Sequence, residues 1–233
     1  MKHLNTYITE YIIKKKLDKP IDSEDHYEYF PKTKNELIDN IKELLDKGET
    51  DLNCIDTSKI TNMSRLFELY ENINFDISEW DVSNVTNMSH MFYNCKKFDC
   101  DLSNWNVSKV KNMSCMFNRC DLFKGKGLEN WNVSNVKDMS YMFLKCENFN
   151  CDLSKWNVSK VENMSSMFYE CKNFNCDLSN WNVSNVFDIN DMFYDCIKFN
   201  CDLSMWDIGK VYRRFGTFHN CTSLKNKPIW YQE

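Results

Sequence analysis

The stretch WNVSKVENMSSMFYECKNFNCDLSN, residues 156–180, decides how the chain folds, because Trp181 begins nearly the same words again. Tryptophan recurs at intervals of 24 to 26 residues along most of the 233-residue chain. A fixed period in the range of about 20 to 50 residues indicates units that stack, since no single unit can close a core by itself. The tryptophans are Trp80, Trp105, Trp131, Trp156, Trp181, Trp206 and Trp230.

Counting each tryptophan as position 0 gives a column of similar residues at each position of the repeat. Ile55 holds the tryptophan place of a first unit, so seven units run from Ile55 to about Ile229. Apolar residues of one column are expected to meet inside the stack and to form continuous ladders. The column at position 12 consists of Phe67, Phe92, Phe117, Phe143, Phe168, Phe193 and Phe218.

The spacing inside one unit predicts a short helix followed by extended chain. The apolar positions 8, 11, 12 and 15 follow the 3.6-residue period of one helical face. Asn163 at position 7 can accept the free amides of a helix start. Positions 18, 20 and 22 alternate with polar residues, as in a strand. In one unit these residues are Met164, Met167, Phe168 and Cys171, followed by Phe174, Cys176 and Leu178.

These patterns predict an α/β fold, namely a single right-handed leucine-rich-repeat-like solenoid of seven coils of about 25 residues. Each coil is expected to combine a short helix with short parallel β-strands that bond to the next coil at roughly 4.8 Å. One extra residue in the third full unit, near Lys124–Gly127, predicts a bulged loop.

The two ends of the chain depart from the repeat. Residues 1–54 are expected to form a helical N-terminal cap, because the first coil would otherwise expose its ladders to water. One helix is predicted over residues 3–17, with a separate partner-binding helix as the alternative there, and another begins at a capping box, Thr33 to Glu36. Residues 55–229 form the repeat, and residues 230–233 form a C-terminal tail. Arg213 and Arg214 break the repeat and predict a polar C-terminal lid.

Composition and charge narrow the possible functions. The net charge is −5 and no basic tract stands out, so no nucleic-acid partner is predicted. No segment is long and apolar enough to span a membrane. The first residues place lysines after the apolar stretch, unlike a secretory signal, so a cytoplasmic location is expected. Twelve cysteines are then expected in a reducing compartment.

The wording of the repeat resembles the BspA-like leucine-rich-repeat surface-protein family. The resemblance rests on FNCDLSNWNVSNV (residues 174–186) and MFYDCIKFN (residues 192–200), and it covers residues 55 to about 224. The segment FPKTKNELIDNIKELL (residues 30–45) is similar to the lead-in of that family. The resemblance implies a solenoid with a protein-interaction role, adhesion in some members and no enzymatic activity. The wealth of lysine and asparagine suggests a giant-virus member.

Two cysteine columns invite a chemical interpretation. Their C-x4-C spacing lies just outside the usual zinc range and follows the repeat, so packing as small buried hydrophobes is favoured over a metal site. A disulfide within a unit, such as Cys171 with Cys176, is the alternative. The columns are position 15, with Cys95, Cys120, Cys146, Cys171, Cys196 and Cys221, and position 20, with Cys100, Cys151, Cys176 and Cys201.

Columns of aspartate and serine are expected to be structural. The aspartates of position 21 are expected to cap turns, with calcium between coils as the alternative, since like charges repel by about 1 kcal/mol even in water. The serine columns repeat without any accompanying histidine column, unlike a catalytic triad, which occurs once. We therefore predict that the protein is not an enzyme and needs no cofactor or metal. The aspartates are Asp76, Asp101, Asp152, Asp177 and Asp202.

A partner is expected where the repeat positions vary. Positions 6, 10 and 13 vary most, and exposed aromatic residues are enriched at binding surfaces. We predict a partner-binding patch over the C-terminal coils formed by Tyr169, Phe187, Tyr194 and Tyr212. The predicted function is a non-enzymatic scaffold for protein–protein interaction, and the alternative is a structural or adhesion protein of a virion or cell surface.

Overall fold

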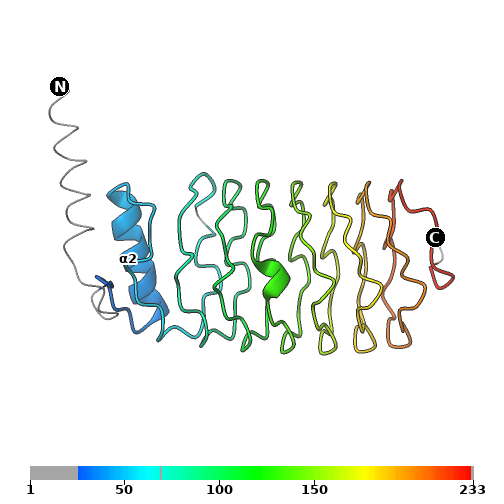
Figure 1. Cartoon of the computed structure of the whole chain (residues 1–233), viewed down its shortest axis with the longest axis horizontal. Coiled ribbons are helices and arrows are strands. Elements are labelled where there is room, and N and C mark those ends of the chain that lie inside the picture. The colour runs from blue at the N-terminus through cyan, green and yellow to red at the C-terminus, as the bar shows by residue number, and fades with distance from the viewer. Residues whose placement is uncertain (1–25, 69, 232–233) are drawn as a thin grey trace, which may run out of the picture.

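The computed structural model describes residues 26–68 and 70–231, and these residues form a row of stacked coils (Figure 1). Helix α2, Lys34–Asp46, lies at one end of the row, and the segment near residue 230 lies at the other. Neighbouring coils are joined by parallel bridges between residues 25 or 26 apart, at position 7 of the repeat. The bridged residues are Asn62, Asn87, Asn112, Asp138, Asn163, Asp188 and Arg213.

The predicted α/β class is wrong. Among the described residues the regular helices are α2 and the short 3-10 helix η1, Leu128–Asn130. The parallel pairings are isolated bridges that extend into no strand and no sheet. The coils are therefore built from turns and extended segments, and the molecule is not an α/β solenoid of seven strand-bearing coils.

The segment predicted as a helix consists of successive tight turns. The amides of Met167 and Cys171 close turns onto carbonyls three residues back, at 3.2 and 2.9 Å. Between them, the amides of Ser166, Phe168 and Glu170 donate to carbonyls of the next coil, at 2.7 to 2.9 Å. An α-helix would keep all of these bonds inside the segment. The two arrangements share the same apolar spacing, so the pattern alone did not separate them.

Left-handed residues produce these turns. Positions 10 and 14 have positive φ in the described coils, as at Ser166 (51°) and Glu170 (56°). Such a conformation costs a non-glycine residue roughly 1–2 kcal/mol and stops a right-handed helix from continuing. The bonds to neighbouring coils offset that cost and hold the main chain in the repeating shape.

The segment predicted as a strand is extended but lacks a backbone ladder. Phe174, Cys176 and Leu178 are buried while Asn175 and Asp177 are exposed, as the alternation predicts. The amide of Asn175, however, donates to the side-chain Oδ1 of Asn150 in the preceding coil, at 2.9 Å. Side chains thus provide bonds that backbone carbonyls provide in a sheet.

The predicted phenylalanine ladder is confirmed. Phe117 stacks on Phe92 and Phe143, with ring centroids 5.3 and 5.7 Å apart and planes within 10°. The position 18 ring packs on the position 12 ring of its own coil, as Phe149 does on Phe143 at 4.0 Å. These rings are fully buried, and each buried aromatic side chain removes about 150–250 Å² from water.

The tryptophans form a second ladder. Trp105 and Trp131 lie parallel, with centroids 6.3 Å apart. The indole N–H of Trp131 donates to the carbonyl of Leu102 at 3.2 Å, and the corresponding bond recurs in the other described coils. This bond allows a polar N–H to be buried without losing a partner.

Helix α2 covers the N-terminal end of the stack. It begins at the predicted capping box, where the amide of Glu36 donates to Thr33 Oγ1 at 3.2 Å. Leu37, Ile41 and Leu44 are buried in the common core, and Gly48, with φ of 82°, follows the helix end. The helix predicted over residues 3–17 lies outside the described residues.

The predicted bulge lies at the extra residue of the third full unit. Gly127 has φ of 95°, and a Cβ there would lie 2.3 Å from the amide nitrogen of Ser103. Only glycine fits this approach, and η1 follows directly. The bulge replaces the aspartate of position 21 with glycine and interrupts the polar column at this coil.

Candidate functional site

A short aromatic stack runs along the surface at position 13. The rings of Tyr169 and Tyr194 lie parallel, with centroids 4.7 Å apart and planes at 8°. His219 continues the stack on Tyr194 at 4.6 Å. The tight turns place these side chains in register on the outside of adjacent coils, and Tyr169 and Tyr194 are half-buried. Partial burial, with a smaller effect of Glu170, raises the pKa of Tyr169.

A second aromatic pair occupies position 6. Phe187 and Tyr212 stack at 5.7 Å with planes at 10°. A shallow cavity of about 480 Å³ beside Phe187 is lined mainly by lysine, glutamate and asparagine side chains. Lys137 and Glu162, at the same position in earlier coils, form an ion pair at 2.9 Å. The aromatic part of this column is therefore confined to the C-terminal coils.

The structure divides the four predicted patch residues into two pairs. Tyr169 contacts Tyr194, and Phe187 contacts Tyr212. No ring contact joins the two pairs in residues 26–68 and 70–231. The surface thus carries two parallel aromatic stripes, each made by matched positions of adjacent coils.

The last coil exposes apolar side chains that the sequence analysis did not single out. Phe215 is 81% exposed, Ile229 96% and Tyr212 71%, and Met205, at the end of the preceding coil, is 87% exposed. Arg213 and Arg214 are exposed as the predicted polar lid requires, but the same coil is also strongly apolar. Phe215 stands at position 9, where earlier coils carry serine or asparagine, and that substitution was the available signal.

A cavity of about 530 Å³ lies at this end of the stack. Below it, Trp230 and Tyr231 pack on the ring of Phe218, at 5.7 and 5.1 Å, and close the core. The lining contains three aromatic side chains, one histidine and the backbone of a glycine with φ of 64°. The lining residues are Tyr194, Phe215, Gly216, His219, Asn220 and Tyr231.

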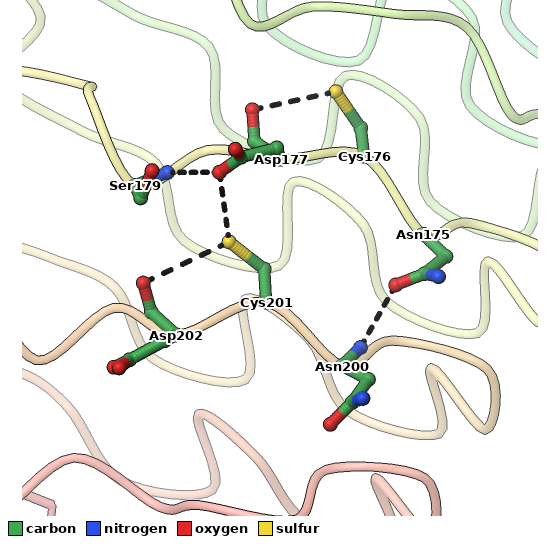
Figure 2. Close-up of a pocket in the computed structure, with 7 residues that line it drawn as sticks. All are labelled: Asn175, Cys176, Asp177, Ser179, Asn200, Cys201 and Asp202. Carbon is green, nitrogen blue, oxygen red and sulfur yellow. Dashed lines mark hydrogen bonds between the residues drawn. The ribbon is translucent and has the colours of Figure 1, made fainter.

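The cysteines of position 20 form part of a polar ladder along another edge (Figure 2). The Sγ atom of Cys201 accepts the amide of Leu178 at 3.2 Å and lies 3.4 Å from Asp177 Oδ1. Asp177 Oδ1 also accepts the amide of Ser179 at 2.9 Å. Asn200 donates its amide to Asn175 Oδ1 at 2.9 Å beside it. Figure 2 shows the Cys201–Asp177 and Asn200–Asn175 bonds, which link two coils through side chains.

The cysteines of position 15 are buried, as the packing interpretation predicted, and each thiol also makes a hydrogen bond. Cys171 Sγ donates to the carbonyl of Phe143 at 2.8 Å, and Cys146 Sγ to that of Phe117 at 2.8 Å. Burial raises the pKa of Cys171 well above that of a free thiol, and that of Cys95 to about 12. In the described residues the cysteines are free, and the alternative Cys171–Cys176 disulfide is not formed.

The aspartates of position 21 cap turns. In the described residues, Asp152 Oδ1 accepts the amide of Ser154 at 2.9 Å, and the same bond recurs at Asp177 and Asp202. These bonds, made by the side chain and backbone of the following serine, lower the pKa of Asp152. No group of three or more histidine, cysteine, aspartate or glutamate side chains that could hold a metal ion occurs in the part of the chain that the structure describes.

Comparison with known proteins gives one family match. The family model described as "Mycoplasma protein of unknown function, DUF285" matches residues 35–127 and again residues 120–230. The chain has no match among curated proteins or solved structures. Within the described residues, no helix has both the length and the apolar character needed to cross a membrane.

Proposed function

The chain belongs to the DUF285 family, and we propose that it works as a non-enzymatic scaffold for protein–protein interaction. The observation that carries the proposal is the pair of surface stripes, Tyr169–Tyr194–His219 and Phe187–Tyr212. The core positions of the coils are nearly constant, whereas the stripes lie at positions that vary. Variation on a constant framework is what a recognition surface requires.

The bonding of the candidate nucleophiles supports the non-enzymatic part of the proposal. The position 15 thiols donate to backbone carbonyls, and burial keeps them protonated at neutral pH. Serine hydroxyls such as those of Ser114 and Ser140 donate to the Oδ1 of the preceding Asn112 and Asp138. The same Oδ1 atoms also accept the backbone amides of Ser114 and Ser140, at 2.8 and 2.9 Å, so the hydroxyl and its acceptor are both part of one turn.

Stacked aromatic residues suit a binding role on physical grounds. Two flat rings held in register have little side-chain entropy left to lose when a partner covers them. Tyrosine also offers a hydroxyl to the partner. The interaction role is also the one that the resemblance to BspA-like repeat proteins implies. We propose the cytoplasm as the location of the protein, with a virion as the alternative.

The experiment compares affinity purification with the wild-type chain and with the double variant Tyr169→Ser, Tyr194→Ser. Tyr93→Ser is the matched control, because Tyr93 stands at the same position of an earlier coil where the next residue of the column is Asn118. We expect a protein retained by the wild type and by the control to be lost with the double variant. Equal retention by all three would refute a role for the stripe.

A further inference from the structure

The hydrogen bonds between coils run in opposite directions at two places of the repeat. At position 6 the amides donate to the preceding coil, as Tyr212 does to the carbonyl of Phe187 at 3.2 Å. In the turn region, amides of one coil donate to carbonyls of the next coil toward the C-terminal end. The carbonyls of Arg213, Phe215, Thr217 and His219 accept such bonds from the preceding coil at 2.8 to 2.9 Å. The alternate amides of the last coil have no acceptor among residues 26–68 and 70–231, and these are Arg214, Gly216, Phe218 and Asn220. Phe218 is buried, so the backbone donors that the C-terminal end presents are those of Arg214, Gly216 and Asn220.

The complementary edge at the other end is covered. The first coil would present the carbonyls of Asn62, Ser64 and Leu66, which correspond to the acceptors of later coils. Helix α2 packs over this end, and Lys34 Nζ donates to the carbonyl of Ser64. In the turn region the stack thus has one capped carbonyl edge and one open amide edge.

The last coil carries a net positive charge, whereas its neighbour carries a net negative charge. The coil from Trp181 to Met205 contains four acidic residues and one lysine, whereas the segment from Trp206 to Tyr231 contains five basic residues and one aspartate. Arg213 forms an ion pair with Asp188 of the neighbouring coil at 3.4 Å, and this pair neutralises one of the positive charges. Arg214 is exposed and has no ion pair among the described residues. An acidic partner complements this end.

We propose that the end formed by residues 212–220 binds an extended, acidic segment of a partner protein. Its backbone carbonyls would accept the amides of Arg214 and Gly216, in the manner of a peptide added to the edge of a sheet. Its carboxylates would meet Arg214, and an apolar side chain would enter the cavity between Phe215 and His219. This inference rests on the proposed function, because it specifies a partner class and an adjoining surface that shares Tyr194 and His219 with the first stripe.

A second copy of the chain does not fit the same end. Two C-terminal ends would bring donors against donors and basic coil against basic coil. The carbonyl edge of another copy lies beneath α2, with Leu37, Ile41 and Leu44 buried there. A partner that supplies free carbonyls and negative charge meets neither obstacle.

The experiment selects phage-displayed random peptides on the purified wild-type chain, and measures synthetic copies of the selected peptides by fluorescence anisotropy. We expect the selected peptides to be rich in aspartate or glutamate with interspersed apolar residues. Their affinity is expected to fall about tenfold or more with the double variant Arg214→Glu, Phe215→Ser, since both changed side chains are exposed. Raising the salt concentration should also weaken binding.

Tyr141→Ser is the control variant, because Tyr141 is an exposed aromatic residue, 41% accessible, in the middle of the stack. It should leave peptide affinity unchanged. Enrichment of basic peptides, no enrichment, or equal binding to the double variant would overturn the inference. Concentration-dependent dimerisation abolished by the double variant would also overturn it. Because Tyr194 also lines the cavity, Tyr169→Ser separates the two surfaces. Loss of peptide binding with Tyr169→Ser but not with the Arg214, Phe215 variant would leave the proposed function standing and this inference refuted.

Discussion

The Sγ atom of Cys201 accepts a hydrogen bond from the amide of Leu178 in the preceding coil, at 3.2 Å. A thiol side chain thus replaces the backbone carbonyl that a β-ladder would supply at this point. Cys176 makes the same bond with Leu153 at 3.1 Å. The cysteines of position 20 are therefore part of the connection between coils and not merely apolar filling.

Cys201→Ala should destabilise the protein by about 1–3 kcal/mol, because the buried amide of Leu178 loses its acceptor. Cys201→Ser is the matched control, since a serine oxygen at the same place can still accept the amide of Leu178. The midpoint of urea-induced unfolding measures both variants. Equal losses would contradict the role given to the Sγ acceptor.

Arg119 tests the left-handed positions without interference from packing, because its side chain is exposed and its φ is 59°. Arg119→Gly should stabilise the protein by up to about 1 kcal/mol, and Arg119→Val should destabilise it by about 1–2 kcal/mol. At Lys111, exposed and with an ordinary φ, glycine should destabilise instead, by about 0.5–1 kcal/mol. If glycine changed the stability in the same direction at Arg119 and at Lys111, the turn geometry would be contradicted.

The thiols should ionise at a higher pH in the folded protein than in the denatured protein. Burial raises the pKa of Cys201 from 9.0 to about 11, and that of Cys95 to about 12. Since these folded-state pKa values are raised, the corresponding stability is fully present below pH 9 and is lost as pH rises through about 11 to 12. Thiolate absorbance should appear in that window for the native protein and near pH 9 for the denatured protein. Native thiols that ionise near pH 9 would contradict their burial.

The ion pair with Lys126 should determine the pKa of Asp101. Lys126, at 2.6 Å, and Ser103 lower the pKa of Asp101 to about 2. This folded-state pKa is depressed, so its contribution to stability is present above about pH 4 and is lost as pH falls toward 2. In Lys126→Ala the pKa of Asp101 should rise, as measured by carbon NMR of the carboxyl group. An unchanged value would show that the ion pair is not formed in solution.

Register and core were predictable from the sequence because they depend only on which residues recur. The column of Phe117 and Phe143, the burial of Cys171 and the start of α2 at Thr33 all follow from recurrence and capping chemistry. Secondary structure was not predictable in the same way. Two tight turns and one helix place Met164, Met167, Phe168 and Cys171 on the same side, so the apolar pattern fits both.

The left-handed residues gave only a weak signal in the sequence, at Asn94, Asp195 and Asn220 of position 14 and at Gly216 of position 10. Before Gly216 of the last coil, position 10 holds His90, Cys115, Tyr141, Ser166 and Asp191, and none of these marks positive φ as glycine does. The four residues of the predicted patch make contact in two pairs, because each pair stands at matched positions, and their role in binding a partner stays a prediction. The C-terminal cavity was missed because the break in the repeat at residues 213–216 was interpreted through its arginines, whereas Phe215 and Gly216 shape the cavity.

The central claim is that coils stack in a 25-residue register with matched side chains in contact. Nuclear Overhauser effects between the rings of Phe117 and Phe143 test it most directly, in protein with isotope-labelled phenylalanine assigned by single substitutions. With centroids 5.7 Å apart, the account predicts direct ring-to-ring effects, and likewise between Phe92 and Phe117 at 5.3 Å. Assigned, folded protein without these effects would contradict the stacked arrangement.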